Sequence, residues 1–586
     1  MATEPVNLPP FARDTGATAD KPMLLKKRAL YERIRASLLL ERSTFESLWR
    51  DIGDNFRPRR TRFWITDRNK GDRRNQDLID STGTFASRTL QSGLHAGLTS
   101  PARPWMRLGT PDPSLSERGP VKAWLHTVTE RMLAVFAQSN LYQALPVVYG
   151  DIGLFATAAM GVMEDEQDLI RCYTYPVGSY SVGIDPRGHP NVFVREYELS
   201  VRQVIDTFAR NEDGSINWSI LSDHVKSLWG SGSTEQGIEL VWIVLQNEDA
   251  DPSKIGAQYL PWASVHYERG REGAARDLGL LRESGFEEFP ILVPRWDVTG
   301  EDAYGTDSPG IIALGDVKGL HVMQKRKAQA VEKQINPPLI GPAGLKTQKT
   351  SLLPGGINYL DIREGQKGLV PVHEVRASIR ELVEDIREHQ FRVRRAFYED
   401  LFLMLQAGDA QRGRQPVTAR EVDERHEEKL LALGPVLERT NDELLDPLVD
   451  RVFAIMDRAG LIPPAPDEMQ GMTLRVEYIS LMAQAQKLVG VAQQDRFMLS
   501  TAQLTEVWPE ARHKIDINKA VDRYADLYGI DPEIVRPTDE AEARAEHEAK
   551  AAQAAQQAEQ LKTEGAGVKS VADAAATVAA SQGSTP

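Results

Sequence analysis

A segment rich in glycine and proline, residues 336–372, lies between two long stretches with helical spacing, and this order limits the folds open to the chain. Ser308 is suited to the N-cap of a helix and Pro309 to its first turn, and Asn336-Pro337-Pro338 ends that helix. Apolar residues between Ile379 and Leu405 recur every three or four positions, which predicts a second helix, about 40 Å long. Two such helices form a hairpin that presents the intervening segment at its tip, a geometry suited to contact with another protein.

The regions on either side of this hairpin differ in their patterns. Helical spacing predominates from Met23 to about residue 160, whereas short strand-like runs between turn signals fill residues 160–300. After a break at 408–416, Thr418-Ala419-Arg420-Glu421 has the capping-box pattern of a helix start. The sequence therefore predicts an α+β fold. The expected elements are helices 23–56, 81–99, 117–145, 146–160 and 418–459, the last kinked at Gly434-Pro435, and strands 169–175, 179–184, 192–199, 238–246, 259–267, 289–296 and 473–479.

Charge is distributed unevenly along the chain. The net charge of −14 argues against a protein that grips nucleic acid over its whole surface, because phosphate binding depends on Lys and Arg. Residues 21–74 are an exception, with 16 basic and 7 acidic side chains. Within them, Arg57 to Trp64 (RPRRTRFW) combines arginines with aromatic residues, which is compatible with a nucleic-acid or partner contact. The alternative, a solvated loop whose arginines pair with acids elsewhere, is the one we favour.

Motifs that carry catalysis or bind cofactors are missing. The stretch nearest to a phosphate-binding loop, Gly341 to Thr347, has the wrong spacing, and Pro342 removes a backbone donor. The 11 histidines are scattered, and Glu164 to Asp168 is better explained as a hairpin tip than as a cation site. We therefore predict no catalytic residues, no cofactor and no metal, and the chain is not expected to be an enzyme.

Features of targeting and membrane insertion are also missing. The longest uncharged apolar run, Ile152 to Met163, is too short to span a bilayer. The N-terminal sequence MATEPVNLPPFARDTG has proline and acid where a signal peptide has an apolar run. The single cysteine, Cys172, allows no intramolecular disulfide and is expected to be a small buried apolar residue. These features predict a protein that is made and used in a cytoplasm, with no membrane partner.

Four stretches, taken together, resemble a known family. They are STGTFASRTLQSGLHAGLTSPARPWMRL (81–108), YPVGSYSVGIDPRGHPNVFVREY (175–197), FPILVPRWDVTGEDAYGTDSPG (289–310) and PVTAREV (416–422). In type and order they resemble the head-to-tail connector, or portal, proteins of short-tailed bacteriophages, and the resemblance covers roughly residues 25–530. It implies a portal-type fold, mainly helical, with a β-rich wing, long stem helices and a small clip insert.

The resemblance also implies a division of the chain into parts. The N-terminal arm precedes a wing that is both helical and β-rich, and the stem helices enclose the clip. A tunnel loop and a crown follow, and the last residues are expected to be disordered. The expected bounds are arm 1–22, wing 23–305, first stem helix 306–335, clip 336–372, second stem helix 373–407, tunnel loop 408–417, wing-crown helix and crown 418–538, Ala/Glu/Gln-rich crown or barrel helix 539–564, and tail 565–586.

The function implied by the resemblance is that of a ring of twelve subunits at one capsid vertex of a virion assembled in the host cytoplasm. Such a ring conducts double-stranded DNA during packaging and ejection, and its partners are the major capsid and scaffolding proteins, the large subunit of the terminase and a tail adaptor. Two alternatives stay open, namely another tail or adaptor component of the virion and, less favoured, an enzyme of the packaging machine.

A DNA channel restricts where basic residues are useful. Each neutralised phosphate adds affinity and slows sliding, so a channel wall should carry few basic groups, and twelve copies at −14 carry −168 in total. On this reasoning the tunnel-loop candidates are Gln411, Arg412 and Arg414, and the stem candidates are Lys325, Arg326, Lys327 and Lys333. Three consecutive basic residues on a helix point in different directions, so at least one of the stem residues must face away from a channel.

Overall fold

The computed structural model divides the chain into two compact units. One contains Met1–Trp105 and Arg131–Ile462, and the other contains Met106–Glu130 and Pro463–Pro586. The structure describes residues 21–335 apart from 68, 70, 117, 118, 212 and 271–279, then 337, 339–340, 370–371, 379–407, 433–469 and 474–480, and short pieces between 482 and 553.

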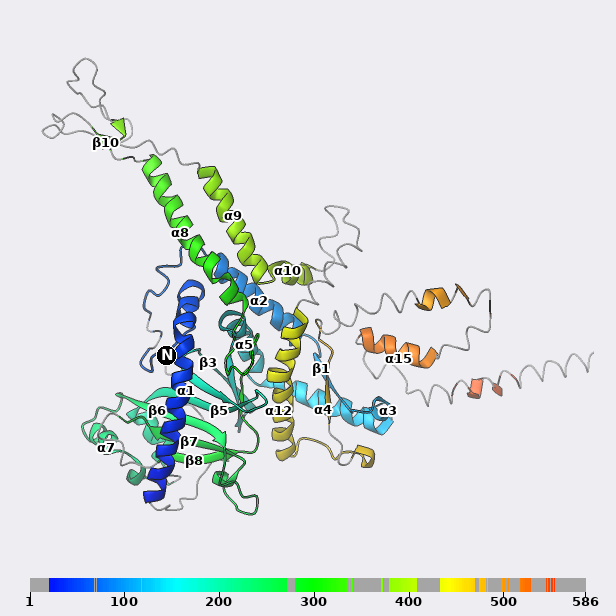
Figure 1. Cartoon of the computed structure of the whole chain (residues 1–586). Helices are drawn as coiled ribbons and strands as arrows, with labels where there is room; N and C mark the ends of the chain where they lie inside the picture. Colours follow the sequence, from blue (N-terminus) through cyan, green and yellow to red (C-terminus); the bar gives the residue numbers. More distant parts are fainter. Residues whose placement is uncertain are drawn as a thin grey trace, which may run out of the picture. The chain divides into compact units, whose positions relative to one another are not determined.

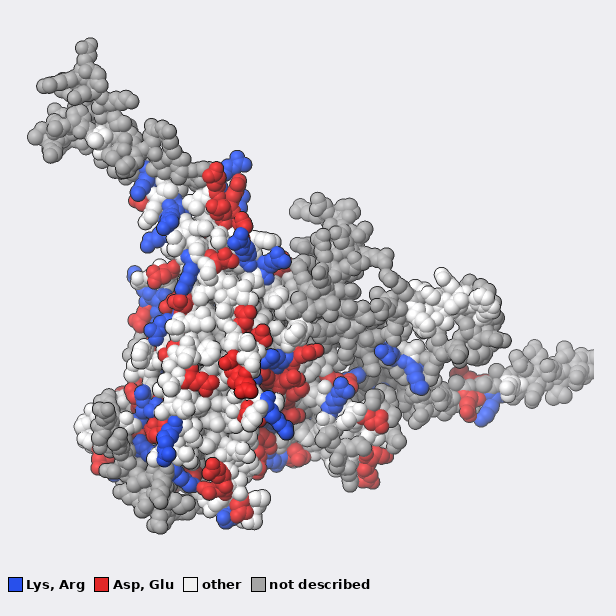
Figure 2. Space-filling model, in the orientation of Figure 1, with Lys and Arg blue, Asp and Glu red and all other residues white. Residues whose placement is uncertain are grey.

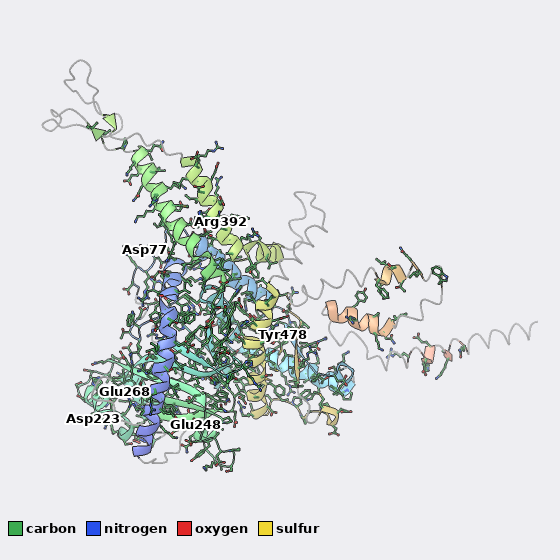
Figure 3. The ribbon with its side chains drawn as sticks, viewed as in Figure 1. Asp77, Asp223, Glu248, Glu268, Arg392 and Tyr478 are labelled. Atoms are coloured by element: carbon green, nitrogen blue, oxygen red, sulfur yellow. The ribbon has the colours of Figure 1, made fainter. Side chains whose placement is uncertain are left out.

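The larger unit contains a five-stranded antiparallel sheet whose strands follow chain order. Helix α1 (Lys21–Phe56) crosses one face of this sheet, where Tyr31 packs with Val194, Val241 and Val265 (Figure 1). The Arg28 guanidinium of α1 donates to the carbonyl oxygen of Glu268 at 2.8 Å, where β7 ends (Figure 3). The strands are β4 (Tyr180–Ile184), β5 (Pro190–Ser200), β6 (Gly237–Gln246), β7 (Trp262–Glu268) and β8 (Arg282–Phe286), and the helices beside them are α6 (Val201–Val204) and α7 (Asp223–Gly230).

A second antiparallel sheet in this unit has the order β3-β2-β9. Its strands are β2 (Ala159–Asp165), β3 (Leu169–Tyr175) and β9 (Ile291–Leu292). Helix α12 (Asp446–Arg458) packs on it through Arg451, which is 2% exposed and donates from Nε to the carbonyl oxygen of Val162 at 2.7 Å. A second buried arginine, Arg295, donates to the Glu443 carboxylate at 2.6 Å. These long-range contacts join residues after 433 to the part of the chain before residue 300.

The remaining helices of the larger unit surround a core of apolar side chains. Helices α2 (Thr82–Leu98) and α5 (Leu141–Phe155) pack together, and Leu90 and Leu145 are almost completely buried. Helices α8 (Pro309–Ile335) and α9 (Ile379–Ala396) form an antiparallel pair, followed by α10 (Glu399–Ala407). Strands β10 (Leu339–Ile340) and β11 (Val370–Pro371) lie between α8 and α9 in the chain and pair antiparallel.

The smaller unit is built around a two-stranded antiparallel ladder. Strand β1 (Met106–Gly109) pairs with β12 (Arg475–Tyr478), and Arg107 donates to the Glu477 carboxylate at 2.8 Å. The backbone N–H of Leu108 donates to Thr129 Oγ of α4 (Gly119–Gln138) at 3.1 Å. The other described elements include α3 (Pro113–Ser116), the 3₁₀ turn η8 (Asp467–Met469) and α15 (Ile517–Tyr528). The first strand of the ladder therefore finds its partner some 370 residues later in the chain.

Most of the strands expected before residue 270 are confirmed within two or three residues, and the acidic run at residues 164–168 is the tip of the β2–β3 hairpin. The expected strand 289–296 is reduced to two residues because Pro290 and Pro294 have no N–H to donate. Strands β1 and β8 are not among the expected strands, and β2 begins at Ala159, inside the helix expected over 146–160. The mixture of helices and strands agrees with the α+β class.

Two expected helices are interrupted. The helix predicted over 379–405 ends at Ala396, because Tyr398 adopts a left-handed conformation (φ 54°), and α10 begins in a new direction. The helix predicted over 117–145 breaks at Ser139 and Asn140. Asn140 is the N-cap residue of α5, and its side chain donates to the carbonyl oxygen of Cys172 and accepts from the N–H of Cys172, both at 2.8 Å. The arm 1–20, the tunnel loop 408–417, the start of the helix predicted at Thr418 and residues 565–586 lie outside the described residues.

Among the helices that the structure describes, none is both long enough and apolar enough to cross a membrane. Within the same described residues, no group of three or more His, Cys, Asp or Glu side chains is placed to hold a metal ion. Cys172 is buried, and burial raises the pKa of its thiol to about 12, so it behaves as a small apolar residue.

Candidate functional site

The antiparallel pair of α8 and α9 is the feature that most clearly presents part of the chain for contact with other molecules. Helix α8 has 27 residues and α9 has 18, which correspond to about 40 Å and 27 Å. In Figure 1 the pair extends from the helices of the larger unit, and β10 and β11 lie after its far end. Leu339 pairs with Pro371 and Ile340 with Val370, so the described chain stops after Ile340 and resumes at Val370 on two paired strands.

The start of α8 is fixed by contacts with the end of α5. Ser308 is completely buried, and its Oγ accepts from the N–H of Ile311 at 3.3 Å, as expected for an N-cap. The same hydroxyl donates to the carbonyl oxygen of Leu154 at 3.0 Å. Gly310 lies so close to this carbonyl that a Cβ there would overlap it. The stretch 289–310 therefore serves to hold α8 on the body of the protein.

A single carboxylate joins both helices of the pair to α2. Asp80 is 8% exposed, and its Oδ2 accepts from Gln324 Nε2 of α8 and from Gln390 Nε2 of α9, both at 3.0 Å. Its Oδ1 accepts from the backbone N–H of Thr82 at 2.8 Å, at the first residue of α2. The N–H of Asp80 donates to His321 Nδ1 at 3.1 Å. Asp80 therefore links α8, α9 and the start of α2.

These hydrogen bonds also determine the charge of Asp80. Burial alone would raise the pKa of this carboxyl group, but the bonds from Thr82, Gln390 and Gln324 favour the ionised form. Their combined effect is larger, and the pKa of Asp80 lies below its ordinary value of 3.8. The joint is therefore charged at neutral pH. Nearby, His389 Nδ1 of α9 lies 2.7 Å from Asp316 Oδ1 of α8, which adds a second polar link between the helices.

The end of α9 is held by aromatic packing. Phe397 is completely buried and contacts Phe56 of α1, with ring centroids 5.6 Å apart. After the left-handed Tyr398, helix α10 places Phe402 against Gly93 of α2, where a Cβ would overlap the ring. This explains Gly93 in the stretch 81–108, because only glycine lets the ring approach α2 so closely.

The four basic residues predicted for the stem do not share one face of α8. Lys325, Arg326 and Lys333 are exposed, whereas Lys327 is half-buried in a shallow groove on the side of α8 that faces α9. No ion pair joins any of the four to another residue within the described part of the chain. Lys and Arg side chains nevertheless lie along the described part of the pair (Figure 2). Gln411, Arg412 and Arg414 lie outside the described residues, so their place relative to the stem residues stays a prediction.

Two arginines of the arginine-rich stretch 57–64 have a structural role. Arg60 makes two hydrogen bonds to the buried Asp151 carboxylate, at 2.6 and 2.5 Å. Arg57 donates to Ser87 Oγ at 3.2 Å and to Gln91 Oε1 at 2.6 Å, and burial lowers its pKa to about 10. The favoured interpretation, in which these arginines pair within the protein, is supported for Arg60. Only Trp64 stays strongly exposed among the aromatic residues of the stretch.

Comparison with known proteins gives a consistent result. The family model described as bacteriophage head to tail connecting protein matches residues 28–535. The chain is 45% identical over 540 residues to a protein of Salmonella phage epsilon15 named "Portal protein", covering 92% of this chain and 93% of that relative. It is 41% identical over 521 residues to a "Probable portal protein" of Bordetella phage BPP-1, covering 89% of this chain and 91% of that relative.

Proposed function

Because this chain belongs to the family of bacteriophage head-to-tail connecting proteins and has the function of a phage portal, we propose that its copies close into a ring of twelve at one capsid vertex. Double-stranded DNA passes through the centre of this ring during packaging and ejection. The observation that carries the proposal is the match of the family model over residues 28–535, together with the projecting α8–α9 pair.

Within this ring we assign parts of the chain to the parts of a portal. Helices α8 and α9 form the stem, and residues 336–372 form the clip between them. The Asp80 joint and the buried N-cap at Ser308 support this assignment, because a stem must be fixed firmly to the body that carries it. The body up to residue 305 is the wing, residues 408–417 form the tunnel loop, and residues from 418 to 538 form the wing-crown helix and crown.

The partners follow from this arrangement. The wing contacts the major capsid and scaffolding proteins, and the clip docks the terminase large subunit during packaging and a tail adaptor afterwards. The protein itself is a structural component of the virion and not an enzyme. The net charge of −14 per copy supports a channel that repels the DNA backbone and lets it slide.

The proposal is tested by imaging and weighing the purified full-length protein. Negative-stain electron microscopy should show closed rings with an axial opening wide enough for a duplex, and native mass spectrometry should give twelve copies. A stable monomer under assembly conditions, or a ring whose centre is filled by a rigid core, would contradict the proposal. Steady hydrolysis of ATP by the pure protein would instead favour the alternative of a packaging enzyme.

The tunnel-loop assignment has a separate test. Replacing Arg412 and Arg414 together by Ala should leave ring formation unchanged and alter the amount of DNA packaged or retained, because the loop arginines contact passing phosphates. The matched control replaces Arg187, which lies in the β4–β5 turn, by Ala. Unchanged packaging and genome retention in the Arg412→Ala/Arg414→Ala protein would remove this role from the loop.

A further inference from the structure

Helix α8 carries an exposed stripe with the spacing of a helix–helix contact. Ile312, Gly315, Gly319, Val322 and Arg326 follow one another at intervals of three and four residues, so they share one side of the helix. Ile312 is 62% exposed and Val322 is 49% exposed, and a Cβ on Gly315 or Gly319 would meet nothing within 4 Å. Glycine weakens an exposed helix relative to alanine, so nothing within the described part of this subunit accounts for these two glycines.

Helix α9 carries a second exposed stripe of complementary character. Glu384, Glu388, Phe391 and Arg395 are spaced by four, three and four residues. Phe391 is 57% exposed, and the side chains of Glu384 and Glu388 are each 61% exposed. Glu388 pairs with Arg392 on the same helix (Figure 3), whereas Glu384 has a longer contact of 3.4 Å to Arg380. The α8 stripe thus has open space at its two glycines and a cation, Arg326, that forms no ion pair with the residues that the structure describes. The α9 stripe has the aromatic ring of Phe391 and two carboxylates.

Each stripe points away from the Asp80 joint. On α8, Gln324 faces Asp80, and Arg326 follows two residues later, which is a rotation of about 200°. On α9, the buried Ile386 faces inward, and Glu384 lies two residues earlier, again about 200° away. Each stripe is therefore open to a second molecule.

The heights of the stripes along the pair also match. Asp316 contacts His389, and Gln324 and Gln390 both bond to one carboxylate. These contacts show which residues of α8 and α9 lie at about the same height along the pair. Counting outward from them, Gly319 lies at about the level of Phe391, and Arg326 lies at about the level of Glu384, to within one helical turn. A rotation about an axis that runs along the pair leaves all these heights unchanged.

A closed ring joins each copy to its neighbours through two different surfaces, since the interface is heterologous. Building on the ring of the proposed function, we propose that the α8 stripe of each copy packs on the α9 stripe of the next copy. Phe391 of one copy lies at the gap formed by Gly315 and Gly319 of its neighbour, and Arg326 pairs with Glu384. Of the four basic residues of the stem, Arg326 then serves the subunit interface and does not face the DNA.

The first experiment fills the gap at Gly319, which should stabilise the isolated subunit but weaken the contact between subunits. Gly319→Leu should make the isolated subunit more resistant to thermal unfolding, because the site is open and leucine favours the helix. The same change should reduce the subunit–subunit affinity at least tenfold, because the leucine occupies the space for Phe391. Phe391→Ala should also weaken the ring. Gly319→Leu rings as stable as those of the wild type would overturn the proposal.

A charge exchange tests the ionic contact. Arg326→Glu and Glu384→Arg should each lower the subunit–subunit affinity by roughly threefold to tenfold, as expected for one accessible pair, and the double exchange should restore most of it. The matched control is Lys325→Glu, which makes the same charge change on the neighbouring residue outside the stripe and should leave assembly unchanged. If Arg326→Glu rings form normally while DNA packaging changes, Arg326 faces the channel and the proposal fails.

A disulfide cross-linking experiment tests the stripe contact independently of whether the ring forms. Gly319→Cys combined with Phe391→Cys should oxidise to a ladder of linked subunits that ends at the full ring, whereas each single variant should stay unlinked. The buried Cys172 does not compete, because its thiol is inaccessible. If the wild-type chain forms rings but the double cysteine variant gives no ladder, the stripe contact alone is overturned. Failure of the wild-type chain to form rings overturns both the stripe contact and the proposed function.

Discussion

The two halves of α8 are opposite in character, although they belong to one continuous helix. The first half, up to Gln324, lies against α1, α2 and α5 and is held by a buried N-cap, a buried histidine and a shared carboxylate. Beyond Gln324, most of the described side chains are exposed, and α9 is the main neighbour of this half. Stability is therefore determined by the buried side of the first half, whereas its exposed side and the second half are free to carry the residues that contact other molecules.

The largest effect is expected at Gly310, in the buried half. Gly310→Ala places a Cβ against the carbonyl oxygen of Leu154, which is backbone and cannot move aside. We expect the free energy of unfolding to fall by about 3 kcal/mol, the upper end of the usual cost of overpacking. Urea denaturation followed by circular dichroism measures this. A loss of less than 1 kcal/mol would mean that the start of α8 is not tightly held.

A smaller loss is expected at the Asp80 joint. Asp80→Ala removes the acceptor shared by Gln324, Gln390 and Thr82, and these donors stay partly buried. The expected cost is about 2 kcal/mol. Hydrogen exchange should show faster opening of α8 and α9, with little change in the five-stranded sheet. Equal acceleration in both regions would show that Asp80 does not act as a local joint.

The pH dependence of the same joint can be separated with Asp80→Asn. Because the pKa of Asp80 in the folded protein lies below 3.8, the ionised carboxylate stabilises the fold above that pH, and this contribution is lost as the pH falls through the folded pKa. The stability difference between the wild type and Asp80→Asn should therefore be constant from pH 7 to about pH 5 and should shrink below about pH 4. A difference that grows on acidification contradicts the assignment.

The exposed side of the same first half predicts the opposite sign for a similar substitution. Gly315→Ala adds a methyl group where nothing lies within 4 Å, so the free energy of unfolding of the dissociated subunit should rise by about 0.5–1 kcal/mol. Gly310→Ala, five residues earlier, provides the contrast. A destabilised Gly315→Ala subunit would show that this side of α8 is already covered within one chain.

The smallest effect is expected at Lys325, which is exposed and forms no ion pair with the described residues around it. Lys325→Ala should change the free energy of unfolding by less than about 0.5 kcal/mol, as is usual for surface positions without a special contact. Thermal unfolding of both proteins at the same concentration measures this. A larger change would place Lys325 in a contact that the exposed half is not expected to contain.

Local patterns in the sequence predicted the elements well, and long-range contacts account for what they missed. Strand 169–175 was predicted to the residue, since its limits depend on its own alternation and turns. The break at Tyr398 was not, because helical spacing continues through it and the cause is the packing of Phe402 on Gly93, three hundred residues away. The Asp80 joint was also missed. A lone aspartate before a helix predicts a cap, and its contacts with Gln324 and Gln390 require the folded chain.

The pairing of β10 with β11 has a consequence for how such a protein can diversify. Residues 341–369 leave and re-enter the described chain at neighbouring positions, Ile340 and Val370. A segment connected in this way can change its length or its whole sequence between lineages without altering any distance in the helices that carry it. Exchange of this segment would therefore give the same pair of helices a different surface to present, with no change in the rest of the chain.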